Sequence, residues 1–277
     1  MALDFVKEKE LQELSKNMRI EIIEMLNKVK TGHPGGSLSA VEIMAVLYFN
    51  QMNIDPQNPQ WEDRDRFIAG KGHCAPIVYV ALAERGYFPK EELRNLRQMG
   101  SILQGHPCML ATPGVDMSSG PLGLGLSAGV GMGIAAKLNK KDYYTYVLLG
   151  DGEIQEGQVW EAAMSAVKFK IDNVITILDN NGVQLDGTND EIMPLGDIGK
   201  KFESFGWNVI HIDGHSIKEI DQAIEVAKTI KNKPSIIIAK TIKGKGVSYM
   251  EGKSIWHGKP LSEEDYKIAM EELGGAN

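Results

Sequence analysis

An aspartate and an asparagine are spaced along this sequence in a way that suits a divalent metal ion. Asp151 stands in the turn Gly150-Asp151-Gly152 after an apolar run, and Asn181 follows the next apolar run, with 28 residues between Gly152 and Asn181. Mg²⁺ prefers near-octahedral oxygen ligation, with few carboxylates completed by phosphate oxygens and water. One carboxylate, one amide and one backbone carbonyl leave room for a diphosphate, which flanking glycines let the backbone approach. The pattern therefore predicts a metal-assisted diphosphate site, although a capped strand–turn–helix alone could also produce it.

Four of the six histidines lie in loops that carry glycine or proline, namely His33, His73, His106 and His257. Their separations match no local zinc motif. Imidazole titrates near neutrality and can pass protons or donate to a hydroxyl or carbonyl oxygen. A single loop histidine is usually only a solvated residue, but four of them in one domain favour a proton-handling site. His211 and His215 are assigned no role.

Two further segments carry residues that suit an anionic ligand. Lys243 lies in a glycine-containing loop that is either solvated or binds phosphate, and a focused cation is useful in an acidic protein. Gly120 and Gly123 stand at the entrance of a glycine-rich helix and are predicted to contact a ligand. The glycines that recur every four residues within that helix (125, 129 and 133) are predicted to allow close packing against another backbone.

The elements that must position these residues alternate between helices and strands. Strands are predicted at 66–69, 144–149, 174–179, 207–212 and 235–241. Helices are predicted at 11–29, 39–50 (opened by a capping box of Ser39 and Glu42), 76–85, 90–99, 122–138, 158–169, 198–205, 217–230 and from about Ser262. Loops are predicted at 31–36 and 100–120.

Several of the predicted strands are apolar on both faces, which is typical of parallel sheets covered by helices. The alternation of strands and helices predicts an α/β fold, doubly wound, with a mainly parallel sheet and helices on both faces. We expect a single domain over residues 1–277. Ligands bind at the carboxyl ends of the strands in such sheets, where Asp151, Asn180, Asn181 and the loop after Thr241 are predicted to lie.

Composition and charge exclude several classes of protein. The net charge of −7 argues against nucleic-acid binding. The uncharged stretch 121–136 carries five glycines and is short for a membrane span, and the N-terminus has no signal-peptide pattern, so we expect a protein without a membrane partner. The two cysteines show no metal-type spacing and fit a reducing compartment, the cytoplasm.

Taken together, the motifs resemble the transketolase family. Gly150-Asp151-Gly152 with Asn181 looks like the thiamine diphosphate motif. Further segments in the family's order are Gly32-His33-Pro34, Lys71-Gly72-His73, Gly105-His106-Pro107, Gly120-Pro121-Leu122-Gly123, residues 150–157, residues 178–181 and Trp256-His257-Gly258-Lys259-Pro260. The resemblance covers residues from about 10 to 265. One departure is Leu124, where the family commonly has glutamine.

The resemblance implies a role for each matching residue. The metal, Mg²⁺ or Ca²⁺, would be bound by the side chains of Asp151 and Asn181 and by the backbone oxygen of Val183. Thiamine diphosphate would be contacted by His73, Gly120, Leu122, Gly152, Lys243 and His257. Glu156 would join contacts between subunits that support the cofactor. His33, His73, His106 and His257 would line the channel for sugar phosphates and act in catalysis.

The same resemblance implies a second polypeptide. The glutamate that activates the cofactor lies, in this family, in a following pyrimidine-binding domain, and we expect that domain and the C-terminal domain to be absent from this chain. The expected partner is a C-terminal transketolase subunit, in a heterotetramer with two copies of each chain. The complex would transfer ketol units between sugar phosphates of the pentose phosphate pathway.

Alternative functions stay open at this point. The chain could be half of a 1-deoxyxylulose-5-phosphate synthase or of a 2-oxo acid dehydrogenase, although His33, His106 and Trp256-His257-Gly258 favour transketolase. It could also be a non-catalytic module that keeps only the cofactor fold. An NAD-binding domain is disfavoured, because no G-x-G-x-x-G follows the first strand.

Overall fold

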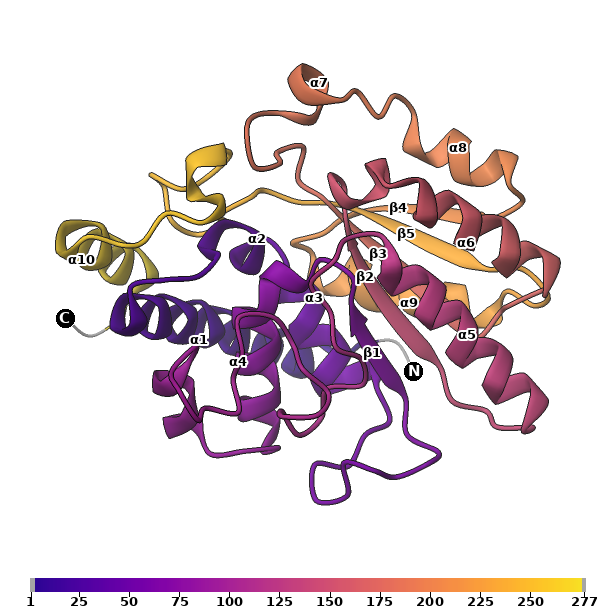
Figure 1. Cartoon of the computed structure of the whole chain (residues 1–277), viewed down its shortest axis with the longest axis horizontal. Coiled ribbons are helices and arrows are strands. Elements are labelled where there is room, and N and C mark those ends of the chain that lie inside the picture. Colours follow the sequence, from indigo (N-terminus) through magenta and orange to yellow (C-terminus); the bar gives the residue numbers. More distant parts are fainter. Residues whose placement is uncertain (1–2, 276–277) are drawn as a thin grey trace.

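The computed structural model describes residues 3–275, and a sheet of five parallel strands forms its centre (Figure 1). The strands stand in the order β1-β2-β3-β5-β4, and each neighbouring pair is parallel. Their bounds are β1 (Arg66–Ala69), β2 (Thr145–Gly150), β3 (Val174–Asn180), β4 (Asn208–Asp213) and β5 (Ser235–Lys240). The predicted parallel α/β fold is confirmed, and every strand boundary lies within one residue of its prediction.

Helices cover both faces of the sheet. The hydrophobic core on one face includes residues of α1 (Phe5–Val29), α3 (Val41–Val46), α4 (Ala75–Arg85) and α9 (Ile217–Thr229). The other packs against α5 (Leu124–Leu138), α6 (Gly157–Lys168) and α8 (Ile198–Ser204). Successive side chains of β2 alternate between the two cores: Tyr146 and Leu148 enter the first, Val147 and Leu149 the second. This alternation explains why the strands read as continuous apolar runs.

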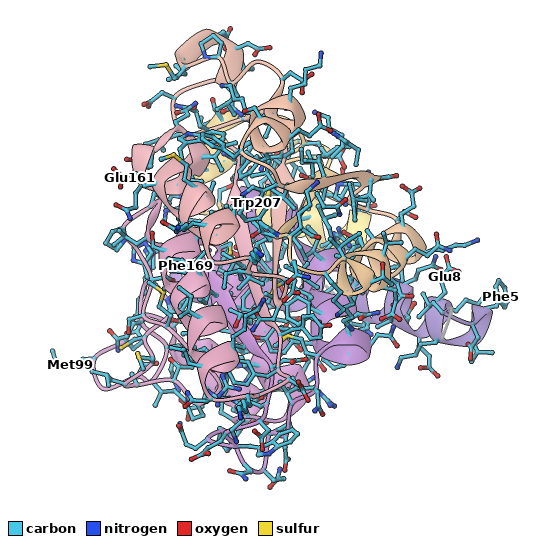
Figure 2. All side chains as sticks on the ribbon, turned by 90° about the vertical axis from the view of Figure 1, so that its right-hand side faces the viewer. Phe5, Glu8, Met99, Glu161, Phe169 and Trp207 are labelled. Atoms are coloured by element: carbon cyan, nitrogen blue, oxygen red, sulfur yellow. The ribbon has the colours of Figure 1, made fainter. Side chains whose placement is uncertain are left out.

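The remaining elements are short or peripheral. They are α2 (Pro34–Leu38), α7 (Asn189–Ile192), α10 (Glu263–Leu273), a π-helical turn (Leu47–Gln51) and 3₁₀ turns at Gly72–Cys74, Lys90–Asn95, Glu153–Gln155 and Ser254–His257. Figure 1 shows α10 beside α1, on the opposite side of the molecule from α5. In Figure 2, Trp207 lies within the packed interior, whereas Phe5 and Met99 project at opposite margins. No helix within residues 3–275 has the length and apolar character needed to cross a bilayer.

The predicted capping box at Ser39 and Glu42 is wrong. Ser39 donates its hydroxyl to Asp179 and to the carbonyl of Gly36, and Glu42 pairs with Arg19. The predicted helix at 39–50 is instead divided into α3 and a π-helical turn. The two side chains serve long-range buried contacts that a local pattern does not reveal.

Three other boundaries differ from prediction. The first helix begins at Phe5, because Asp4 accepts the backbone N–H of Lys7 as its N-cap. The predicted loop 31–36 contains the start of α2, which Pro34 opens at its first position. The predicted helix 90–99 is only a 3₁₀ segment, Lys90–Asn95, and residues 100–120 form a loop as expected.

The glycines of α5 bring this helix against the sheet. A Cβ added at Gly125 would lie 2.7 Å from the Cα of Gly70, and one at Gly129 would lie 2.5 Å from a methyl group of Val147. A Cβ at Gly131 would meet nothing within 4 Å. The predicted close packing against another backbone is therefore confirmed at Gly125, whereas Gly129 and Gly133 pack closely against the side chains of Val147 and Val174.

A buried ion pair joins the carboxyl ends of the strands. Lys71, directly after β1, pairs with Asp179 in β3, and both side chains are almost completely buried. The Lys71 ammonium also donates to the carbonyl of Gly36 at 2.8 Å. Asp179 accepts the hydroxyls of Ser39 (2.6 Å) and Thr241, which follows β5. Burial opposes ionisation of both partners, yet the pairing raises the pKa of Lys71 and lowers that of Asp179.

The packing of α5 predicts opposite effects for two similar substitutions. Gly131→Ala should raise the unfolding free energy by about 1 kcal/mol through helix propensity. Gly125→Ala should lower it by about 1–3 kcal/mol, because the new methyl group meets backbone that cannot move cheaply. Urea unfolding of both variants measures the difference. Equal stability of the two would contradict the close approach of α5 to Gly70.

The ion pair predicts a large effect for Lys71→Met. Removing the ammonium leaves the Asp179 carboxylate buried without a counter-charge, which should lower the unfolding free energy by about 3–5 kcal/mol. Lys218→Met on the exposed face of α9 is the control and should stay within about 0.5 kcal/mol of the wild type. If the two variants have the same free energy of unfolding in denaturant, the ion pair does not hold the strand ends.

Candidate active site

The carboxyl ends of β1, β2, β3 and β5 border one cavity of about 340 Å³. Its lining includes nine of the predicted site residues: His73, Leu122, Asp151, Gly152, Glu156, Asn181, Val183, Lys243 and His257. The polar side chains predicted from separate strand ends therefore share one space. Leu122 and Glu156 lie at the exposed rim, and the others are buried or half-buried.

The remaining three predicted residues adjoin this cavity. The ring centroid of His33 lies 5.6 Å from that of His73, 6.4 Å from that of His106 and 5.4 Å from that of His257. His73 and His257 stack at 4.8 Å. Gly120, whose φ is +155°, would place an added Cβ 3.4 Å from the ring of His106. Loops from both ends of the chain thus bring four imidazoles into one cluster.

Asp151 is a buried carboxylate without a cationic partner. It follows β2, is 2% exposed, and forms no ion pair with the residues that the structure describes. Its oxygens accept the backbone N–H groups of Gly152 (2.8 Å) and Gly182 (2.5 Å). Burial, together with the nearby Asp179 carboxylate, raises the pKa of Asp151. A cation placed against this group would relieve an unfavourable buried charge.

The chain beyond β3 adds two more oxygens to the same cavity. The side-chain oxygen of Asn181 accepts the N–H of Val183 at 3.0 Å, and the backbone oxygen of Val183 accepts the ammonium of Lys243 at 2.9 Å. Lys243 also lies 3.0 Å from Nδ1 of His257. Burial, with the nearby ammonium of Lys71, lowers the pKa of Lys243 to about 8.

This donor set fits a hard divalent cation. It consists of the Asp151 carboxylate, the Asn181 amide oxygen and the backbone carbonyl of Val183, which already accepts a hydrogen bond from the Lys243 ammonium. Residues 3–275 contain no group of three or more histidine, cysteine or acidic side chains arranged to hold a metal ion. A donor set with a single carboxylate suits Mg²⁺ that also binds an external anion.

The four clustered imidazoles are held in their neutral form. Burial is the largest cause, and it lowers the pKa of His33 to about 4 and that of His257 to about 3. The pKa values of His73 and His106 are lowered for the same reason. Nδ1 of His33 is buried without a hydrogen-bond partner in the described structure. Neutral rings with free nitrogen atoms can exchange protons with hydroxyl groups that enter the cavity.

Sequence reasoning missed three residues that build this site. Lys71 lines the cavity and pairs with Asp179; both stand in segments that match the family, but sequence reasoning gave neither a role. Glu153 accepts the N–H of Gly150 at 3.0 Å and that of Gly123 at 3.1 Å, and so joins two glycine turns. Burial raises the pKa of Glu153 to about 7. Its position two residues after Asp151 was the available signal, but nothing local showed which way it points.

Comparison with known proteins agrees with this geometry. Residues 11–277 match the family model described as "Transketolase, thiamine diphosphate binding domain". The chain is 46% identical to a 6-deoxy-6-sulfo-D-fructose transketolase subunit from Clostridium sp. (strain MSTE9), over 95% of this chain and 96% of that protein. It is 42% identical to one of the subunits of an apulose-4-phosphate transketolase from Phocaeicola vulgatus, over 94% of this chain and 92% of that protein.

A solved structure gives the same result in three dimensions. The transketolase from Campylobacter jejuni superposes with a TM-score of 0.90 at 37% identity, over 96% of this chain. The match covers 43% of that chain, so this protein spans less than half the length of such relatives. Sequence family, fold and site geometry coincide, and the chain belongs to the transketolase family as its thiamine diphosphate-binding domain.

Proposed function

We propose that this chain is the diphosphate-binding subunit of a two-chain transketolase, which transfers a two-carbon ketol unit from a ketose phosphate to an aldose phosphate. The observation that carries the proposal is the convergence of Asp151, Asn181, the Val183 carbonyl and Lys243 on one cavity. Together they offer oxygen ligands for a cation and a buried ammonium for an anion, the two requirements of a metal diphosphate.

Asp151 and Asn181 would hold the metal by their side chains and Val183 by its backbone oxygen. Mg²⁺ is the proposed ion, with Ca²⁺ as a substitute, because a single carboxylate leaves positions for phosphate oxygens and water. Lys243 and Gly152 would contact the diphosphate. Further proposed contacts to the cofactor are His73, Gly120, Leu122 and His257. When bound, thiamine diphosphate supplies the carbon–carbon bond chemistry, and the protein orients it.

The histidine cluster would handle protons at the substrate. His73 and His257 line the cavity proposed for the diphosphate, whereas the ring of His33 lies between them and His106, 6.4 Å or less from each of the three. Neutral imidazoles at these positions would accept protons from sugar hydroxyls or donate hydrogen bonds to carbonyl oxygens. Their lowered pKa values keep them neutral across the physiological range, so small changes of pH should not alter their state.

A second polypeptide would complete the enzyme. Two relatives whose lengths this chain nearly spans are named as subunits, whereas the matched region makes up less than half of the Campylobacter jejuni transketolase. The proposed partner is a C-terminal, pyrimidine-binding transketolase subunit, with two copies of each chain in the assembly. Glu156, exposed at the start of α6, would contribute to the contacts between subunits. The proposed setting is the pentose phosphate pathway in the cytoplasm, which suits the two free cysteines.

The metal assignment predicts a strong effect for Asp151→Asn. The substitution keeps the shape of the side chain and removes its charge, so affinity for thiamine diphosphate with Mg²⁺ should fall on the order of 100-fold. Asp186→Asn, at the exposed rim of the same cavity, is the matched control and should bind as the wild type does. Calorimetric titration of the assembled complex gives both constants. Unchanged binding by Asp151→Asn would refute the metal site.

The two-chain assignment predicts that activity depends on mixing. This chain alone should show no ketol transfer, and adding the pyrimidine-binding subunit from the same cells should produce transfer that a metal chelator abolishes and Mg²⁺ restores. Product formation should be followed with a panel of ketose phosphates and sulfonated ketoses, since the names of the relatives specify different sugars. Turnover by the isolated chain would show that no partner is required.

A further inference from the structure

Each residue from 241 to 244, directly beyond β5, forms a hydrogen bond to a different part of the fold through its backbone or its side chain. Thr241 donates its hydroxyl to Asp179 in β3, and the N–H of Ile242 donates to Nε2 of His215 at 2.9 Å. The ammonium of Lys243 reaches the carbonyl of Val183, and the N–H of Gly244 donates to the carbonyl of Gly35 in α2 at 2.9 Å. The position of Lys243 is therefore set by backbone and side-chain hydrogen bonds to several elements.

The contact of Ile242 and a further contact at Lys245 come from a single network around Glu42. Arg19 in α1 pairs with Glu42 in α3 through both of its terminal nitrogens, at 2.6 and 2.8 Å. Glu42 in turn lies 3.0 Å from Nδ1 of His215. Arg19 Nε donates to the carbonyl of Lys245 at 3.0 Å, while His215 accepts the N–H of Ile242. The network thus forms hydrogen bonds to the backbone on both sides of Lys243, at Ile242 and at Lys245.

The hydrogen bonds assign the direction of each contact. Because the N–H of Ile242 donates to Nε2 of His215, that nitrogen is the acceptor and Nδ1 carries the proton that is donated to Glu42. Glu42 is almost fully buried; burial opposes its ionisation, but the His215 and Arg19 donors lower its pKa to about 2. The carboxylate therefore stays ionised and fixes both the histidine ring and the arginine plane.

Lys243 needs such anchors because its own environment opposes its charge. Its side chain is 2% exposed, and burial is the main cause of its lowered pKa. An ammonium on a loose loop would move into water, where it is better solvated. The Ile242 side chain is 37% exposed, so side-chain packing alone holds this part of the loop only weakly.

We propose that Arg19, Glu42 and His215 form a positioning clamp, which fixes the backbone around Lys243 so that its ammonium meets the anionic end of the cofactor. The proposal rests on the function proposed above, in which Lys243 contacts the diphosphate. None of the three side chains lines the cavity, so they act through the loop and not on the cofactor itself.

Two substitutions at His215 separate the anchor from the rest of the network. His215→Gln places an amide oxygen about as far out as Nε2 and can still accept the N–H of Ile242. His215→Asn reaches only as far as Nδ1, so it can donate to Glu42 but leaves Ile242 without an acceptor. Thiamine diphosphate with Mg²⁺ is titrated into the full chain assembled with its partner, and unfolding by urea is measured in parallel.

The clamp predicts that His215→Asn weakens cofactor binding by up to about tenfold, the scale of one lost hydrogen bond, and that His215→Gln stays within about threefold of the wild type. Hydrogen exchange at the Ile242 amide of the chain should accelerate in His215→Asn only. Arg19→Lys, which keeps the charge beside Glu42 but has no Nε donor for Lys245, should also weaken binding. A purely structural role would instead make cofactor affinity follow the unfolding free energy across the variants.

Wild-type affinity in His215→Asn, or equal weakening in both His215 variants, would overturn the clamp. Lys243→Met separates this result from a failure of the proposed function. If Lys243→Met binds the cofactor normally, Lys243 does not contact the diphosphate. Both the proposed contact and the positioning role of the clamp are then wrong. If Lys243→Met weakens binding strongly while His215→Asn does not, the function stands and the clamp alone fails.

Discussion

The buried ion pair between Lys71 and Asp179 holds the carboxyl ends of three strands at the spacing that the site requires. A buried pair is costly to desolvate and stabilises a fold only when its remaining donors and acceptors are satisfied. Here the Gly36 carbonyl and the hydroxyls of Ser39 and Thr241 meet that condition. Apolar side chains of similar volume would fill the same space, but they would not orient the turns that follow β1, β3 and β5.

The same pair divides the roles of two neighbouring carboxylates. Asp179 and Asp151 are both buried, yet the pKa of Asp179 is lowered and that of Asp151 is raised. The difference follows from their partners, because Lys71 neutralises Asp179 directly while Asp151 receives only backbone N–H groups. The Asp179 carboxylate is thereby neutralised by an ion pair within the fold, whereas the Asp151 carboxylate remains available to an external cation.

Close contacts between backbone segments hold the turns that surround these two carboxylates. Gly125 lets α5 rest against the turn that precedes Lys71, and Glu153 joins the turns at Gly123 and Gly150. The loop beyond β5 is fastened in a similar way through Arg19 and its partners. These contacts come from elements far apart in the chain, so the cavity forms only when all of those elements are folded together. A small change in their packing should therefore shift the residues that line the cavity.

The spacing of apolar residues along the sequence by itself determined the strands and most of the helices. It also determined that the sheet is parallel, because both faces of the strands are apolar. It also placed Asp151, Asn181 and Lys243 at strand ends, where the topology of such sheets brings side chains together. It did not reveal that Ser39 and Glu42 serve Asp179 and Arg19 in place of a helix cap, that His215 accepts a hydrogen bond from Ile242, or that Glu153 points inward. Those contacts join residues that are distant in sequence or depend on the direction of a side chain, and only tertiary packing decides which donor meets which acceptor.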